Sequence, residues 1–151
     1  MGPTASRRRL GLAQIVAVGA SELGPDYYAG VVAEYQSRRD LLFDGLTKIP
    51  GVFLRKPEGA FYFIARLPIR DSEDFAAWLL TDFARDRRTV MVAPAPGFYA
   101  TPGLGADEVR IAYVLKEEDL RTSIRLLGEA IPAYCAARGI PAPAALAAQG
   151  A

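Results

Sequence analysis

The chain contains no histidine and only one cysteine, and these two absences exclude several kinds of functional site. Without histidine, the chain cannot supply serine–histidine or cysteine–histidine catalysis, or a histidine ligand to a metal. A single cysteine, Cys135, excludes an internal disulfide and argues against a thiolate metal site. Cys135 lies near the expected end of a helix, which favours an unreactive apolar role. We therefore expect no metal site.

Net charge and long apolar runs are also scarce. The formal net charge of +1 predicts no general attraction to nucleic acid or to a membrane surface. No apolar run approaches the ~20 residues of a membrane span. Arg7, Arg8 and Arg9 precede an apolar segment, as in a secretory signal, but Gln14 interrupts that segment and no clear cleavage site follows. The sequence thus predicts a cytoplasmic protein with neither a nucleic-acid nor a membrane partner.

The order of apolar patterns and turn residues predicts a small α+β fold. With 151 residues the chain can form one domain with a real core. The pattern predicts helices over 10–22, 26–48 and 73–86 and a last helix that opens at 116–119, with short strands at 52–54, 60–67, 90–92 and 107–115. We expect a mostly antiparallel sheet that is covered by helices and preceded by a long interdomain helix.

Three segments follow from this order. Residues 1–25 are expected to be an N-terminal segment with a short helix, and residues 26–134 the folded domain. The helix over 26–48 is longer than the typical three or four turns, so we expect it to connect two structural bodies. The alanine- and proline-rich residues 135–151 are expected to form a flexible tail.

Arg110 stands out because it lies in the middle of the apolar strand D-E-V-R-I-A-Y-V-L. Side chains alternate along a strand, so Val109, Ile111 and Tyr113 should share one face and Arg110 the other. A buried arginine requires an anionic partner. The strand alone leaves two interpretations open: Arg110 is solvated or paired with an acid of the chain, or its planar guanidinium holds a substrate carboxylate through two hydrogen bonds.

Three further features have both a structural and a functional interpretation. Gly59 closes the turn K-P-E-G, either as an ordinary turn glycine or where a backbone passes close to a ligand. The aromatic residues 61–63 fit a core, and also a binding site. The loop over 93–105 contains Phe98 and is rich in proline and glycine. A loop of this length is either a plain surface connection or a functional segment that closes over a site.

The succession of motifs is more specific than any one of them. The segments K-P-E-G-A-F-Y-F, V-M-V-A-P-A-P-G-F, E-V-R-I-A-Y and E-E-D-L occur in this order, each in its expected structural context. Together they resemble the C-terminal small domain of class I/II aminotransferases, the fold type I enzymes that depend on pyridoxal phosphate. The resemblance extends from about Gln14 to Tyr134 and is nearest to the aspartate aminotransferase-like branch.

This resemblance implies roles for individual residues. Arg110 matches the arginine that binds the substrate α-carboxylate, Gly59 matches a turn whose backbone lies near the substrate, and Phe98 would form part of the apolar wall. The helix over 26–48 matches the connection to the large domain, and closure of the small domain would exclude water. The implied partners are an amino acid, a 2-oxo acid, the large domain and a second subunit of a homodimer. Aspartate is the donor suggested by the branch, with alanine-type and aromatic amino acids left open.

The chain also departs from the family. Transamination requires a lysine that forms an aldimine with pyridoxal phosphate, and in the family this lysine belongs to the large domain in a Ser-x-x-Lys context. The lysines here, Lys48, Lys56 and Lys116, do not match it. We therefore expect no catalytic and no cofactor-binding residue in this chain, which should be inactive by itself. The parent enzyme is expected to act in amino-acid biosynthesis. The alternative is a stand-alone, non-catalytic module that binds a carboxylate or a protein partner.

Overall fold

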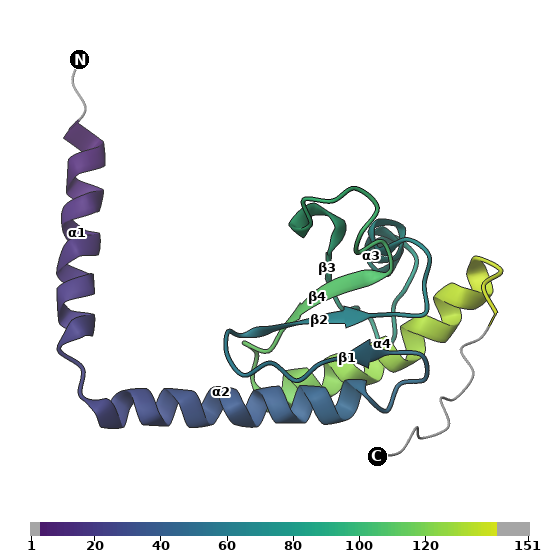
Figure 1. Cartoon of the computed structure of the whole chain (residues 1–151), viewed down its shortest axis with the longest axis horizontal. Helices are drawn as coiled ribbons and strands as arrows, with labels where there is room; N and C mark the ends of the chain where they lie inside the picture. Colours follow the sequence, from purple (N-terminus) through teal and green to yellow (C-terminus); the bar gives the residue numbers. More distant parts are fainter. Residues whose placement is uncertain (1–3, 142–151) are drawn as a thin grey trace. The chain divides into compact units, whose positions relative to one another are not determined.

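The computed structural model describes residues 4–141, in which the chain divides into two compact units (Figure 1). The first unit ends at Glu34 and the second begins at Tyr35, so the boundary lies inside one helix. No helix in the described part of the chain is both long and apolar enough to cross a membrane.

The first unit consists of α1 (Thr4–Ser21) and the beginning of α2 (Pro25–Leu46). Gly24 and Pro25 separate the two helices, because proline favours the first position of a helix, where no backbone N–H is required. The Tyr28 hydroxyl donates a hydrogen bond of 2.8 Å to the carbonyl of Ala20 and so ties α2 to the end of α1. The exposed large apolar side chains of this unit are Ile15, Val16, Val18, Leu23, Tyr27, Tyr28, Val31 and Val32.

The second half of α2 belongs to the core of the second unit. Leu42, Leu46 and Ile49 are buried, and Tyr35 packs against the core at its edge. Before Tyr35, the side chains of α2 are exposed. The helix thus changes from exposed to buried along its length. Its role as a connection between two bodies stays a prediction.

Four short strands form one antiparallel sheet in the order β1-β2-β4-β3. Their bounds are β1 (Phe53–Leu54), β2 (Tyr62–Arg66), β3 (Ala93–Pro94) and β4 (Glu108–Ala112). The central pair, β2 and β4, places Ile64 opposite Arg110 and Phe63 opposite Ile111. Strand alternation gives the sheet one buried face and one exposed or half-buried face. The predicted α+β class with a small antiparallel sheet is confirmed.

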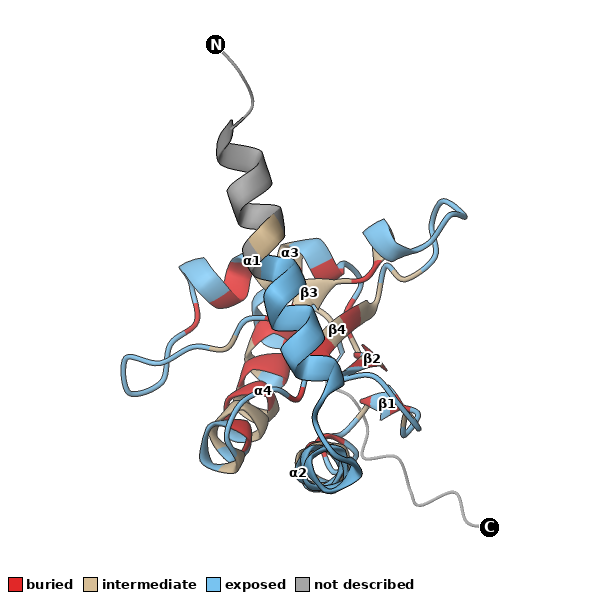
Figure 2. Cartoon of the chain, turned by 90° about the vertical axis from the view of Figure 1, so that its left-hand side faces the viewer, coloured by how far each residue is buried: buried red, intermediate tan, exposed pale blue. Residues whose placement is uncertain are grey.

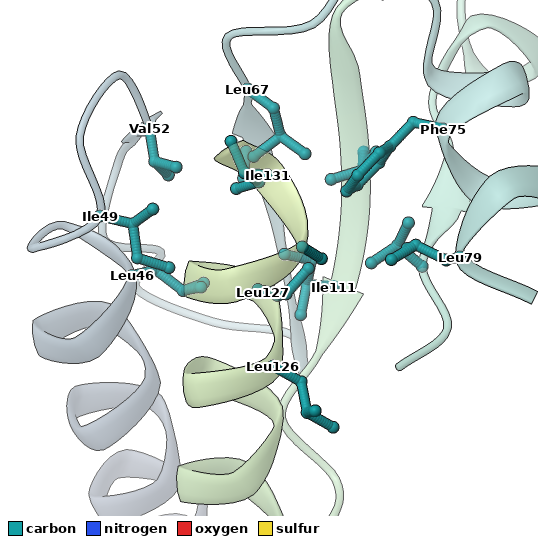
Figure 3. Packing of buried hydrophobic residues seen from close by; sticks show 14 of the residues in the cluster. Leu46, Ile49, Val52, Leu67, Phe75, Leu79, Ile111, Leu126, Leu127 and Ile131 are labelled. Atoms are coloured by element: carbon teal, nitrogen blue, oxygen red, sulfur yellow. The ribbon is translucent and has the colours of Figure 1, made fainter. Parts of the chain in front are cut away.

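Helices α3 (Ser72–Thr81) and α4 (Glu117–Ala137) pack with the end of α2 on the buried face of the sheet. Figure 3 shows their side chains converging, with Leu46 and Ile49 near Leu127 and with Phe75 on the α3 side. In Figure 2 the buried positions gather on α3, α4 and the strands, while the described side chains of α1 are mostly exposed. The hydrophobic core therefore lies entirely within the second unit.

Asp71 is the N-cap residue of α3. Its carboxylate accepts hydrogen bonds from the backbone N–H groups of Glu73 and Asp74, at 2.8 and 3.1 Å. The predicted end of this helix at residue 86 is wrong, because α3 ends at Thr81. A tight turn follows instead, in which Asp86 and Arg87 both have positive φ and are incompatible with a continuing helix.

Two other predicted boundaries also change. The strand predicted at 90–92 is wrong: β3 pairs with β4 only at Ala93 and Pro94, opposite Arg110 and Val109. Val92 is nevertheless buried, so its apolar character reflects the core rather than sheet pairing. The flexible tail was predicted to start at residue 135, but α4 continues to Ala137 with Cys135 buried in it. The rest of the predicted tail, from residue 142, lies outside the described residues.

Candidate functional site

The candidate site is the face of the sheet that the helices leave uncovered. Alternation along β4 buries Val109 and Ile111 in the core and turns Arg110 to the opposite face, as the sequence predicted. Arg110 has Ile64 of β2 on one side and Ala93 of β3 on the other, so it occupies an interior position of the sheet. Its neighbours fix its backbone, and its side chain is half-buried.

Two aromatic rings lie close to the Arg110 guanidinium. Its central carbon lies 4.5 Å from the centroid of the Phe98 ring and 5.3 Å from the centroid of the Tyr62 ring. Both distances fall within the range of cation–π attraction, which fits arginine better than lysine because the guanidinium is planar and weakly hydrated. The rings come from different parts of the chain. Tyr62 begins β2, and Phe98 ends the short 3-10 helix η1 (Pro96–Phe98).

Arg110 forms no ion pair with any residue that the structure describes. The aromatic rings compensate part of the cost of its burial but accept no strong hydrogen bonds from its five N–H groups. A planar carboxylate can accept two parallel hydrogen bonds from such a guanidinium. An ion pair with an acid of the chain is thus not found among the described residues, while the other interpretations of Arg110, a solvated guanidinium and a site for an external carboxylate, both stay predictions.

The acidic residue nearest in the strand, Glu108, is held by another partner. The Tyr99 hydroxyl donates a hydrogen bond to Oε2 of Glu108, and this bond raises the pKa of Tyr99 above its usual value. Gly105 makes the arrangement possible. Its φ is +76°, and a Cβ placed there would lie 2.5 Å from Cε2 of Tyr99. The loop over 93–105 thus positions Phe98 and Tyr99 side by side, each against a different residue of β4.

Gly59 lies in an exposed turn that is attached to the core. The buried Tyr113 directs its hydroxyl to the carbonyl oxygens of Gly59 and Ala60, at 3.2 and 3.0 Å. A Cβ at Gly59 would meet nothing within 4 Å, and the residue of this turn with positive φ is Ala60, at 64°. The structure records no contact between Gly59 and Arg110. The approach of this turn to a ligand therefore remains a prediction.

A groove of about 330 Å³ lies on the same sheet face, toward β1. Ile64 and Glu108 contribute to it, as does Arg66, whose guanidinium lies 5.3 Å from the centroid of the Phe53 ring. Arg66 is thus a second arginine stacked on an aromatic ring of this face, two residues beyond the strand partner of Arg110. It provides a matched comparison for experiments on Arg110.

The residues that the structure brings together only partly match those predicted from the sequence. Arg110 and Phe98, which the resemblance named separately, are in contact, and their roles in substrate binding stay predictions. Tyr62, Tyr99 and Glu108 were not predicted as site residues. Tyr62 was considered only as part of an aromatic cluster with a core or a binding role, although its neighbour Phe63 is the one that enters the core. The alternation of residues 61–63 between the two faces of the strand could have separated Phe63 from Tyr62. The contact of the Tyr62 ring with Arg110, however, depends on a strand register that the sequence does not specify.

Comparison with known proteins relates the chain to aminotransferases. It is 34% identical over 105 residues to the probable aspartate/prephenate aminotransferase of Aquifex aeolicus, an alignment that spans 64% of this chain and 23% of that protein. It is 34% identical over 126 residues to the valine–pyruvate aminotransferase of Mycobacterium tuberculosis, spanning 80% of this chain and 30% of the relative. No protein-family model matches the chain.

A solved structure shows the same fold. The α-aminoadipate aminotransferase LysN of Thermus thermophilus, in complex with N-(5'-phosphopyridoxyl)-L-leucine, superimposes with a TM-score of 0.65 at 22% identity, covering 83% of this chain and 31% of LysN. The chain thus spans about a quarter to a third of the length of the aminotransferases that it matches. These comparisons confirm the resemblance to part of a fold type I aminotransferase that the sequence motifs indicated.

Proposed function

We propose that this chain, which is related to one part of the fold type I aminotransferases, is the small domain of a pyridoxal-phosphate-dependent aminotransferase. In the complete enzyme it would bind the α-carboxylate of an amino acid and of a 2-oxo acid during transfer of the amino group. The observation that carries the proposal is the half-buried Arg110, whose guanidinium lies near the rings of Tyr62 and Phe98 and has no ion pair in the described part of the chain.

The residues present do not fit covalent attachment of the cofactor. An aldimine requires an amine that can lose its proton close to the substrate. Lys56 forms an ion pair with the Asp40 carboxylate at 2.9 Å, and Lys48 and Lys116 are exposed. We therefore propose that pyridoxal phosphate and the catalytic lysine belong to the portion of the relatives that this chain does not span, and that the chain alone does not transaminate.

The donor substrate is proposed only by class. A guanidinium that grips a carboxylate recognises what all α-amino acids share, and the names of the relatives include aspartate, prephenate and valine. Aspartate, the donor suggested by the sequence, is the first to test. Placement in the cytoplasm and in amino-acid biosynthesis also remains part of this proposal.

The exposed apolar surface of the first unit supports a partner within the same enzyme. Ile15, Val16 and Val18 are 60–70% exposed, and Tyr27 and Val32 are each more than half exposed. Neighbouring apolar side chains in water favour association. We propose that α1 and the beginning of α2 pack against the large domain or against the second subunit of a homodimer. The isolated 151-residue chain should consequently self-associate, which sedimentation velocity over a range of protein concentrations would detect.

The role of Arg110 is tested in the complete gene product, starting from the DNA upstream of the Met1 codon. An upstream reading frame with a Ser-x-x-Lys motif is expected. Arg110→Gln should raise KM for amino acid and 2-oxo acid by roughly 30-fold or more, because charged hydrogen bonds contribute about 2–3 kcal/mol. The visible absorption of the bound cofactor should stay unchanged, which would show that the protein remains folded.

Arg66→Gln is the matched control, since it removes a guanidinium from the same sheet face and is expected to change KM little. Equal effects of both substitutions would argue for a general charge effect and against a specific clamp. If Arg110→Gln left KM unchanged, the proposed role would be wrong. An isolated, monomeric chain that binds a 2-oxo acid through Arg110, with no upstream reading frame, would instead favour the non-catalytic module.

A further inference from the structure

Glu108 and Arg110 have opposite charges, belong to the same strand and lie on the same face of the sheet. Residues two positions apart on a strand are separated by roughly 6.7 Å, a distance that both side chains can bridge. No ion pair between them is found among the described residues. Glu108 is the one acidic residue in the described strands β1–β4, so it is the residue of the sheet that could compete with an incoming carboxylate.

Glu108 has a different partner in the structure. The Tyr99 hydroxyl donates a hydrogen bond to Oε2 of Glu108. The backbone N–H of Tyr99 bonds to the carbonyl of Pro96 at 3.2 Å, so the tyrosine directly follows the same turn that places Phe98 over Arg110. One short segment therefore fixes both the acid and the arginine of β4.

The loop is shaped to keep Tyr99 in this position. The ring packs against Gly105, where even a methyl group would overlap with it. Glu108 itself is anchored at both backbone polar groups, since its N–H donates to the carbonyl of Gly105 and its carbonyl accepts from the N–H of Ala95, both at 3.0 Å. With its backbone fixed, Glu108 can change partners only by rotation of its side chain.

We propose that Tyr99 is a positioning residue, which holds Glu108 away from Arg110 and so leaves the guanidinium to the carboxylate of the substrate. The proposal rests on the function assigned to Arg110 above. It predicts that loss of the Tyr99 hydroxyl frees Glu108 to pair with Arg110, and that this internal carboxylate then competes with the external one. An ion pair at a half-exposed position contributes little, so the competition should weaken substrate binding by up to about fivefold.

The test uses Tyr99→Phe, Glu108→Gln and the double variant in the complete gene product. Tyr99→Phe should raise KM for the amino acid about two- to fivefold with kcat unchanged, because the internal pair opposes ground-state and transition-state binding equally. The double variant should return KM to the wild-type value or below it, since a neutral amide does not compete for the guanidinium. A crystal structure of Tyr99→Phe should show the Glu108 carboxylate within 4 Å of the Arg110 guanidinium nitrogens.

Tyr134→Phe is the matched control. It also removes a tyrosine hydroxyl from a carboxylate, the 2.7 Å bond to Oδ2 of Asp74, but at the contact between α3 and α4. It should leave KM unchanged. Unchanged KM in Tyr99→Phe, or an increase that Glu108→Gln does not reverse, would overturn the proposal. Either result could occur while Arg110→Gln still raises KM strongly, so failure of the positioning role is distinguishable from failure of the proposed function.

Discussion

The Phe98 ring lies over the Arg110 guanidinium, with 4.5 Å between the ring centroid and the guanidinium carbon. The contact joins η1 to the neighbouring strand β4, and the guanidinium carbon also lies 5.3 Å from the ring centroid of Tyr62 of β2. Phe98 is 56% exposed, so a ring that could have been buried elsewhere instead covers a cation at the surface. This placement makes the loop over 93–105 part of the site.

Phe98→Ala should weaken substrate binding through loss of this ring. A cation–π contact at an exposed position contributes about 0.5–1 kcal/mol, so KM of the complete enzyme should rise roughly two- to fivefold, with kcat nearly unchanged. Met91→Ala is the control, because Met91 is also an exposed apolar residue, at 76%, and lies outside the predicted site. Similar KM values for the two variants would show that Phe98 covers Arg110 without contributing to binding.

Gly105→Ala should disturb the loop more than its backbone conformation alone requires. Gly103 and Gly105 have similar φ values, +85° and +76°, and at both positions alanine should lose about 1–2 kcal/mol of stability. Only at Gly105 would the new Cβ meet Tyr99, at 2.5 Å, whereas at Gly103 it would meet nothing within 4 Å. Urea unfolding should therefore show a larger loss for Gly105→Ala than for Gly103→Ala. Equal losses would mean that Tyr99 moves aside at no cost.

Strand β4 and the loop over 93–105 show which parts of the site could be predicted from the sequence. Local alternation was sufficient to assign Val109 and Ile111 to the core and Arg110 to the opposite face, because the two-residue period of a strand depends only on its backbone. The role of Phe98 came from the family resemblance. Neither source indicated Tyr99 and Glu108, since their contact is made by the return of a loop whose conformation depends on Gly105.

Sheet register limited the prediction in the same way. The apolar residues Val90, Met91 and Val92 were predicted to form a strand, yet pairing with β4 begins only at Ala93. A buried side chain such as Val92 can pack against helices without any ladder hydrogen bond, so local β propensity cannot distinguish the two situations. Which residue of β2 faces Arg110 likewise depends on long-range pairing.

Substitution of Gly45 tests how closely α2 packs on α4. A Cβ at this position would lie 2.5 Å from Cδ1 and 2.9 Å from Cγ2 of Ile124. Gly45→Ala should therefore destabilise the fold by about 1–3 kcal/mol, the usual cost of overpacking, despite the better helix propensity of alanine. Gly30→Ala in the same helix, where a Cβ meets nothing within 4 Å, should instead gain up to about 1 kcal/mol. Chemical denaturation of both variants checks the opposite signs, and a gain at Gly45 would contradict the observed packing.

The hydrogen bonds between Asp74 of α3 and residues at the C-terminal end of α4 should make the stability of the fold depend on pH in the acid range. Arg138 holds the Asp74 carboxylate with two hydrogen bonds of 2.7 and 2.8 Å, and the Tyr134 hydroxyl donates a third. The Arg138 guanidinium, followed by Tyr134, lowers the pKa of Asp74 from its ordinary value of 3.8 to about 2. Because the folded-state pKa is below the unfolded one, this stabilisation is fully present above about pH 4 and is lost as pH falls through about 2.

Asp74→Asn removes the titrating group and retains the shape of the side chain. The wild-type chain should have the higher urea midpoint at pH 7, and the difference between the two proteins should narrow steadily as the pH is lowered from 4 to 2. Asp44→Asn, an exposed position on α2 for which the structure records no side-chain ion pair, should show no such narrowing. A difference between wild type and Asp74→Asn that stays constant across this range would mean that the charge of Asp74 contributes nothing, and that the contact between α3 and α4 depends on apolar packing alone.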